Sequence, residues 1–341
     1  MIKVEIQGAD KSSDILVGEM LENLADYIPS ENVVIITDEN VSKYYLEKFP
    51  KFNVITIGTG EGVKTLDTAS DIYQQLLDMD SQRSTFLVGI GGGIVCDITG
   101  FIASTFLRGI PFGFVSSTLL SQVDASVGGK NGVNHRGYKN MIGVFNQPGF
   151  VICDNRLLKT LPKRELLSGF AEIIKHAAIE DADYFTYLEE NCDKALALDH
   201  DVIEKIVYDS VIIKSEVVNR DEQEKGERRK LNFGHTFGHA IEKTFKIPHG
   251  EAVSLGMVLA GLLSARKGLL DIETANRITD LLRQYGLPVD IDFDRNKILE
   301  ALDKDKKRKG DNIHFVLLED IGKSVIMEIS IDELKNVIHE L

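Results

Sequence analysis

The sequence predicts an α/β domain built on a parallel sheet, followed by a mainly α-helical domain. Short β-rich runs alternate with helical patterns through the first 150 residues, as in parallel sheets with crossover helices. Further along, apolar residues recur every three or four positions, which is the helical period. A chain of 341 residues is long enough for two domains. We place the division between residues 1–154 and 155–341.

Four apolar runs are expected as strands: VVIITD (33–38), FNVITI (52–57), TFLVGI (85–90) and FGFVSS (112–117). After FVICD (150–154) the pattern becomes helical, as in AVSLGMVLAGLLSA (252–265) and TANRITDLLRQYGL (274–287). The charged segment 220–230 is expected as an exposed connection. Two late runs, 313–319 and 324–330, predict a short strand pair, and the acidic turn that follows predicts a final helix.

The net charge of the chain limits the kinds of molecule that it can bind. A net charge of -14 and a pI near 5.1 argue against a general nucleic-acid or acidic-membrane surface, because phosphates would be repelled. The first residues lack a signal-peptide pattern, and the longest apolar run is too short to cross a bilayer. Three cysteines without a CxxC motif favour a reducing cytoplasm.

A glycine-rich turn follows the third expected strand. Gly89 and Gly91–Gly93 stand between a buried run and a helix, where bare N–H groups and a positive helix end suit a phosphate. Asp38 ends an earlier strand, where a carboxylate suits ribose hydroxyls. A tight turn without any ligand is the alternative for the glycines, and Glu61 and Lys64 on their own would pass as surface charge.

A second polar concentration follows the fourth strand. Asp124, Lys130, Lys139 and Asn140 lie among small residues, a composition that suits a polyhydroxylated anion better than a core. Arg108 precedes a glycine and a proline, which favours an outward-reaching guanidinium. Each charge taken singly would be ordinary solvated surface.

Three histidines suggest a metal. His235 and His239 are four apart on an expected helix and share one face, and His249 opens the next helix between a proline and a glycine. HxxxH alone is more often structural, and the HExxH pattern is absent. Catalytic zinc commonly takes three His or carboxylate ligands, so an acid is also required.

Glu172 is the candidate acid, since it lies in an apolar helix and needs a partner there. Lys175, three residues on, would serve as that partner without any metal. His176, four residues on, is a rival ligand. Spacing alone leaves these readings open.

Together these segments resemble the 3-dehydroquinate synthase family, the cyclising enzymes of the shikimate pathway. The motifs occur in the family's order: VDASVGGKNGVN, GYKNMIG, GFAEIIKH, LNFGHTFGHAIE, HGEAVSLGM and DKKRKGDNIHFVLL. The resemblance implies a Rossmann-like NAD domain and a helical metal-binding domain. It implies conversion of 3-deoxy-D-arabino-heptulosonate 7-phosphate to 3-dehydroquinate and phosphate, with NAD oxidising the substrate transiently.

The resemblance also implies residue roles. Zinc or cobalt would be held by Glu172, His235 and His249, with His239 facing the phosphate instead of the metal. Asp124 and Lys175 would face the ring hydroxyls, and Lys214 and Arg228 the carboxylate. The phosphate would be held by Lys130, Asn140, Asn232, His239 and one lysine of the DKK motif, Lys306. The positions matched to NAD binding are Asp38, Asn40, Glu61, Lys64, Gly92, Gly93, Asp97, Ser117, Thr118, Lys139 and Thr160. Arg108 would reach the neighbouring subunit's site, which implies a homodimer.

Three other functions compete with this one. A related sugar-phosphate cyclase would act on a substrate without the carboxylate. A metal-dependent alcohol or glycerol-phosphate dehydrogenase would release NADH stoichiometrically. A non-catalytic binding protein descended from an enzyme would be favoured by a missing ligand, and the sequence keeps all three ligand positions.

Overall fold

The computed structural model describes residues 1–8, 11–290, 294, 296–300 and 312–339. The chain forms two compact units: residues 1–162 with 203–223, and residues 163–202 with 224–341. The first unit therefore ends eight residues beyond the expected division. It also includes most of helix α7 (His200–Arg220). Hydrogen bonds such as Gln7 N to Asn219 Oδ1 (2.9 Å) tie α7 to this unit.

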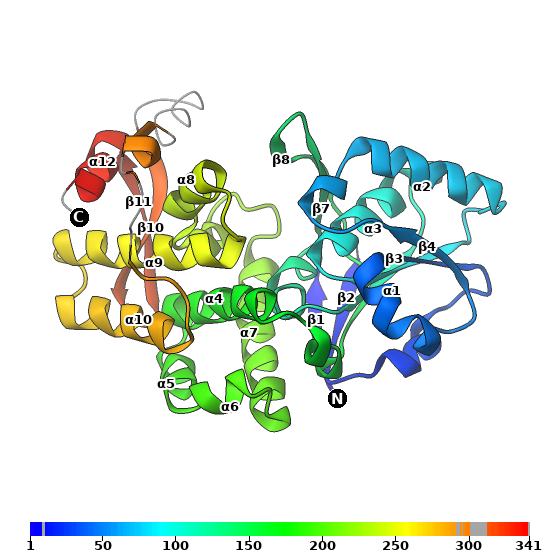
Figure 1. The fold of residues 1–341 in the computed structure, drawn as a ribbon, viewed down its shortest axis with the longest axis horizontal. Coiled ribbons are helices and arrows are strands. Elements are labelled where there is room, and N and C mark those ends of the chain that lie inside the picture. Colours follow the sequence, from blue (N-terminus) through cyan, green and yellow to red (C-terminus); the bar gives the residue numbers. More distant parts are fainter. Residues whose placement is uncertain (9–10, 291–293, 295, 301–311, 340–341) are drawn as a thin grey trace. The chain divides into compact units, whose positions relative to one another are not determined.

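The first unit is built on a seven-stranded sheet (Figure 1). Neighbouring strands are parallel, except for the antiparallel pair at one edge. In spatial order the strands are β1 (Ile2–Gln7), β2 (Ser12–Val17), β9 (Phe150–Cys153), β6 (Phe112–Ser116), β5 (Phe86–Gly91), β3 (Val33–Asp38) and β4 (Asn53–Ile57). The predicted parallel sheet is confirmed, and the edge strands β1 and β2 were not expected.

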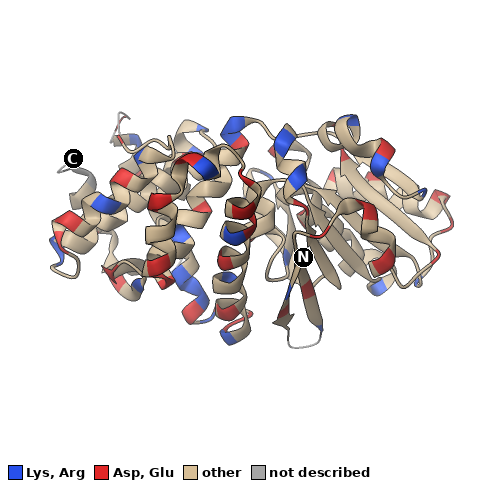
Figure 2. Ribbon diagram, turned by 90° about the horizontal axis from the view of Figure 1, so that it is seen from below, with Lys and Arg blue, Asp and Glu red and all other residues tan. Residues whose placement is uncertain are grey.

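Three helices connect the strands of this sheet: α1 (Glu39–Tyr45), α2 (Leu66–Asp78) and α3 (Gly93–Thr105). The central strands β9, β6 and β5 carry no charged residue and are fully buried, and the charges of both signs lie mainly on helices and loops (Figure 2). This is the burial expected of parallel strands covered on both faces.

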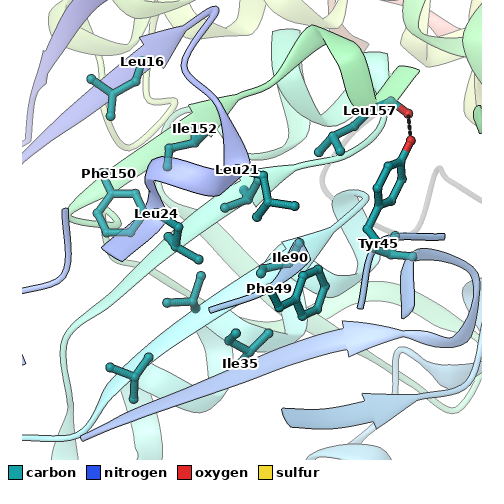
Figure 3. Close-up of a cluster of buried hydrophobic side chains, with 14 of the residues drawn as sticks. Leu16, Leu21, Leu24, Ile35, Tyr45, Phe49, Ile90, Phe150, Ile152 and Leu157 are labelled. Carbon is teal, nitrogen blue, oxygen red and sulfur yellow. Dashed lines mark hydrogen bonds between the residues drawn. The ribbon is translucent and has the colours of Figure 1, made fainter. Parts of the chain in front are cut away.

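One core cluster of this unit gathers side chains from strands and helical segments (Figure 3). Ile35 and Ile90 are fully buried, and the Phe86 and Phe150 rings stack with centroids 5.7 Å apart. Tyr45 closes the cluster, with its hydroxyl donating to the Leu157 carbonyl at 3.2 Å.

A polar hairpin adds to the same unit. Its strands, β7 (Lys130–His135) and β8 (Tyr138–Phe145), pair antiparallel and pack against α3.

The second unit is mainly helical, as predicted. Its helices are α4 (Lys163–Glu180), α5 (Ala182–Glu190), α6 (Cys192–Leu196), α8 (His235–Phe245), α9 (His249–Arg266), α10 (Ile272–Gln284) and α12 (Ile331–His339). The strand pair is confirmed as β10 (Asn312–Asp320) and β11 (Lys323–Ser330). α9 is apolar on all sides and packs against α4, α8, α10 and β10, so it is the central element of this unit.

The connection into α8 differs from its expectation. It contains a short 3-10 helix, Glu227–Asn232, in which Arg228 is only 2% exposed. The expected exposed segment is therefore wrong at Arg228, because the short helix turns this side chain inward. Within the described part of the chain, no helix combines the length and apolarity needed to span a bilayer.

Candidate functional site

The sheet of the first unit has a topological switch point between β3 and β5. The chain leaves β3 through α1 toward β4 on one side, and leaves β5 through α3 toward β6 on the other. In open α/β sheets, nucleotides bind at the carboxyl ends of strands at such a point. Asp38 and the glycine turn lie at these two strand ends, as the sequence predicted.

The glycine turn leaves the start of α3 open to an anion. Gly92 is the N-cap, no side chain caps the helix, and its first turn carries no acidic residue. A Cβ at Gly92 would lie 2.9 Å from Thr118 Cγ2, so a side chain at this turn would require Thr118 to move. Uncapped N–H groups at a helix start suit a pyrophosphate. The observed turn is compatible with the dinucleotide site that the sequence suggested.

Asp38 has a structural role at the start of α1. Its Oδ1 accepts a hydrogen bond from Val41 N at 2.9 Å and caps α1. Burial raises the pKa of the Asp38 carboxyl above its ordinary value. The remaining carboxylate oxygen is the one that suits a ribose hydroxyl.

Lys64 is the centre of a polar cluster in the same unit. It is 4% exposed, its ammonium contacts Asp97, and it donates to Asn140 Oδ1 at 2.5 Å. Burial raises the pKa of Asp97 to about 6, and the Lys64 charge opposes that rise. Lys64 is therefore not the surface charge that its sequence context allowed.

Asn134 joins this cluster and was not predicted. Its Nδ2 donates to Glu61 Oε1 at 2.6 Å, and its Oδ1 accepts from Asn140 N at 2.9 Å. It sits in β7 as the last residue of the motif VDASVGGKNGVN, and no role was predicted for it from the sequence. The structure thus brings Glu61 and Lys64, which are neighbours in the sequence, together with the distant Asp97 and Asn140.

Lys214 and Asp124 form a second pair in this unit. Lys214 comes from α7 and is 6% exposed; its ammonium contacts the Asp124 carboxylate and donates to the Asp124 carbonyl at 2.5 Å. Thr118 and Ser121 cap the same segment by exchanging hydrogen bonds between side chains and backbone. Ser117 is buried, whereas the exposed predicted residues of this unit are Asn40, Glu61, Arg108, Lys130, Lys139, Asn140 and Thr160.

The second unit gathers the predicted metal ligands. Glu172 on α4 is fully buried, and its Oε1 lies 3.0 Å from His249 Nε2 and 3.4 Å from His235 Nε2. Lys175 contacts the other carboxylate oxygen. The partner that the sequence offered as an alternative to the metal is therefore present together with both imidazoles.

Two close helix contacts create this arrangement. Gly250 approaches Ser168 so closely that a Cβ would lie 2.3 Å from Ser168 Cα, and Glu172 is one turn beyond Ser168 on α4. A Cβ at Gly256 would lie 1.9 Å from the Gly234 carbonyl oxygen, at the start of α8. Because His235 and His249 are the first residues of α8 and α9, these contacts place both imidazoles beside Glu172.

Gly256→Ala is expected to destabilise the protein by about 1–3 kcal/mol or more, because the added methyl meets the backbone and forces α8 and α9 apart. Chemical denaturation measures the loss, and zinc affinity should fall with it. Gly261→Ala on the same helix is the control, since its Cβ would have nothing closer than Ala275 Cβ at 3.9 Å. An unchanged unfolding midpoint for Gly256→Ala would contradict the contact.

The imidazoles of His235 and His249 are oriented by contacts to their Nδ1 atoms, which point away from Glu172. His235 Nδ1 lies 3.1 Å from the Phe233 carbonyl oxygen, and His249 Nδ1 lies 3.3 Å from Glu242 Oε2. Both oxygens are acceptors, so both Nδ1 atoms carry a proton, and each Nε2 presents a lone pair to Glu172 whenever it holds no proton of its own. Two lone pairs and a carboxylate repel one another unless a proton or a metal ion lies among them.

The charges support a cation site. Burial alone would raise the pKa of Glu172, but the charges of Lys175 and His235 and hydrogen bonds from both imidazoles hold that pKa well below its usual value. Desolvation would lower the pKa of His249, but Glu172 and Glu242 raise it to about 10. Without metal, a proton thus takes the place of the cation.

The donor set and its spacing fit zinc. One carboxylate and two imidazoles form a typical catalytic set, and ligand atoms about 2.0–2.1 Å from a tetrahedral Zn²⁺ lie roughly 3.3 Å apart. The ligand atoms of Glu172, His235 and His249 all lie within 4.8 Å of one another. His239, Glu242 and His249 form a second such group, with His239 exposed.

Comparison with known proteins identifies the family. Residues 54–168 match the family model for the 3-dehydroquinate synthase N-terminal part, and residues 169–308 match the C-terminal part. A curated 3-dehydroquinate synthase of Dehalococcoides mccartyi is 42% identical over 327 residues, covering 93% of this chain and 91% of the relative. Another, from Acetivibrio thermocellus, is 42% identical and covers 100% of this chain and 99% of the relative.

The chain belongs to the 3-dehydroquinate synthase family.

Solved structures of similar fold extend the comparison of this family member. A 2-deoxy-scyllo-inosose synthase with carbaglucose-6-phosphate, NAD⁺ and Co²⁺ has a TM-score of 0.90 at 28% identity, covering 99% of this chain and 100% of that one. A 2-epi-5-epi-valiolone synthase from Streptomyces hygroscopicus with NAD⁺ and Zn²⁺ has a TM-score of 0.89 at 26% identity, each chain covered to 98%. A probable glycerol dehydrogenase from Sinorhizobium meliloti, at 16% identity and a TM-score of 0.68, shares the fold.

The remaining predicted residues of this 3-dehydroquinate synthase family member fall into three cases. Asn232 donates from Nδ2 to Glu224 Oε1 at 2.6 Å in the second unit, where Arg228 is buried. His239 is exposed on α8, with its ring centroid 5.3 Å from that of His235. Lys306 lies outside the described residues.

Proposed function

We propose that this chain is a 3-dehydroquinate synthase that converts 3-deoxy-D-arabino-heptulosonate 7-phosphate to 3-dehydroquinate and phosphate. The reaction is a carbon–oxygen lyase reaction with transient oxidation, phosphate elimination, reduction and intramolecular aldol closure. We assign NAD to the first unit and Zn²⁺ or Co²⁺ to the second. The observation that carries the proposal is the convergence of two imidazole Nε2 atoms on the buried Glu172 carboxylate, in a chain 42% identical to curated synthases.

When bound, the metal supplies Lewis acidity toward a substrate hydroxyl, and NAD supplies a hydride acceptor that later returns the hydride. Glu172, His235 and His249 hold the metal. Lys175, 1% exposed beside Glu172, keeps that carboxylate ionised and is assigned with Asp124 to the ring hydroxyls. The first turn of α3 binds the pyrophosphate through its N–H groups, and Asp38 binds ribose.

The substrate's two anionic groups are assigned to cationic and amide side chains. Lys214 and Arg228 bind the carboxylate, for which a guanidinium offers paired donors. The residues assigned to the substrate phosphate are Lys130, Asn140, Asn232, His239 and Lys306. The other residues assigned to NAD are Lys139, Asn40, Ser117, Thr118, Thr160, Glu61, Lys64 and Asp97.

Phosphate release tests the activity. The protein, catalytic NAD and the heptulosonate phosphate are mixed while free phosphate and absorbance of NADH are followed. We expect phosphate release without net NADH. Release only with glucose 6-phosphate or sedoheptulose 7-phosphate would reject the synthase in favour of a related cyclase, and steady NADH accumulation would favour a dehydrogenase.

We further propose a cytoplasmic homodimer in which Arg108 serves the neighbouring subunit's site. Arg108 is exposed and has a φ of 68°, next to Leu107 at 49° and Gly109 at 112°. Three successive left-handed residues form a sharply bent turn at the end of α3. Such a turn suits a side chain that reaches away from its own domain.

Mixing two inactive variants tests this role. After joint refolding of Arg108→Ala with Glu172→Gln, we expect activity to return to about a quarter of wild type, because half of random dimers are hybrids with one intact site. Gel filtration measures the dimer. Absence of recovery in isolated hybrid dimers would show that Arg108 does not act across subunits.

A further inference from the structure

We propose that Glu242 is a positioning residue that fixes His249 for metal binding, an inference that rests on the proposed function. Glu242 lies in the last turns of α8, seven residues after His235 and on the same helix face. Its Oε2 lies 3.3 Å from His249 Nδ1, while His249 Nε2 lies 3.0 Å from Glu172 Oε1. The His249 ring is thus held between two carboxylates, one on each nitrogen.

The two histidine ligands are held by different means. His235 is 9% exposed, and the Phe233 main-chain carbonyl holds its Nδ1, a contact that no side-chain substitution removes. The His249 side chain is 30% exposed and follows Pro248 at the first position of α9. Its Nδ1 contact comes from a side chain, so the more exposed ligand depends on Glu242.

In this contact the Glu242 carboxylate binds the ring nitrogen of His249 that points away from the proposed metal. A carboxylate that accepts a hydrogen bond from Nδ1–H fixes the tautomer, leaves the lone pair on Nε2, limits ring rotation and strengthens Nε2 as a metal ligand. The Glu242 side chain is 12% exposed, so water weakens the contact only in part. Glu242 therefore acts on the metal through His249 and not by direct contact.

A competing arrangement has Glu242 as a ligand itself, together with His239 and His249. The burial of the residues argues against it. Glu172 is fully buried beside Lys175, whereas His239 is exposed. The two arrangements predict different behaviour of His239→Ala, which leaves the Glu172 group whole and breaks the Glu242 group.

Zinc affinity of the full-length protein tests the proposal, measured by competition with a chromophoric chelator. We expect Glu242→Ala to weaken zinc by about 10–100-fold, and Glu242→Gln by less, because an amide oxygen still accepts from Nδ1–H. Glu251→Gln is the matched control: Glu251 lies two residues after His249, and its partner is Arg164, at 2.5 Å. His239→Ala and Glu251→Gln should both bind zinc like the wild type.

Two further measurements separate positioning from a structural role or direct ligation. The visible absorption of bound Co²⁺ reports the coordination number, and saturated Glu242→Ala should keep the wild-type band pattern. The unfolding midpoint of the metal-free variants should differ little from that of the wild type. Wild-type zinc affinity in Glu242→Ala, or a matching loss in His239→Ala, would overturn the proposal. If Glu172→Gln binds zinc as tightly as the wild type, the proposed function fails as well.

Discussion

Glu172→Gln is expected to lower the rate of phosphate release on the order of 10³-fold or more, since the Lewis acid contributes several kcal/mol to the transition state. Glutamine keeps the size of the side chain and removes the charge that both imidazoles and Lys175 face. Elemental analysis of the purified variant should show no stoichiometric zinc or cobalt. Full activity with bound metal would remove Glu172 from the site.

The variant has a predictable structural side effect. Lys175 is 1% exposed, and the loss of its counter-charge leaves a buried ammonium unpaired by Glu172, which costs roughly 3–5 kcal/mol. Glu172→Gln combined with Lys175→Met should recover stability without recovering metal or activity. Glu165→Gln, at an exposed position of the same helix, is the control and should change neither property.

Lys214→Ala is expected to raise the apparent KM for the carboxylate-bearing substrate by about 10–100-fold, because a lost charged hydrogen bond is worth on the order of 1.5–3 kcal/mol. Lys214 contacts the carboxylate of Asp124. Its removal therefore also takes a positive charge away from the Asp124 carboxylate, which would further weaken the binding of an anionic substrate. Steady-state kinetics with the heptulosonate phosphate measure the change.

The controls for Lys214 use the same helix and a simpler substrate. Lys205→Ala removes an exposed lysine of α7 that pairs with Asp209 at 2.6 Å, and should leave KM unchanged. An analogue of the substrate without the carboxylate should bind Lys214→Ala and the wild type with similar affinity, apart from the effect of Asp124. An unaltered KM for the full substrate would rule out the carboxylate role.

The buried parallel strands were predictable because their signal is local. VVIITD and FGFVSS are continuous apolar runs, and β3 and β6 coincide with them to within one residue. The β7–β8 hairpin gave no such signal: KNGVNH and YKNMIGVF lack clear alternation, and β8 is mostly exposed. The hairpin nevertheless carries Lys130, Lys139 and Asn140. The sequence motifs therefore identified these residues as candidates, but did not predict that they lie on a hairpin.

The residues of the candidate metal site were predictable from the sequence, and the contacts that position them were not. Glu172, His235 and His249 stand out because acids and imidazoles in apolar or glycine-flanked positions need a reason. Glu242 lies in the last turn of a helix of ordinary polarity, and its partner His249 lies beyond the link to the next helix. Asn134 is similar, since its partners Glu61 and Asn140 come from other segments. Contacts between elements have no local pattern.

Gly256 sets the contact between the two helices that carry the histidines. Because it has no side chain, main chain touches main chain where α8 and α9 meet. The distance between His235 and His249 is consequently set by a contact between main chains, whose size does not change when side chains are substituted. Proteins of this fold can therefore exchange the side chains around the candidate metal site, and so change the substrate, while the spacing of the two imidazoles stays the same.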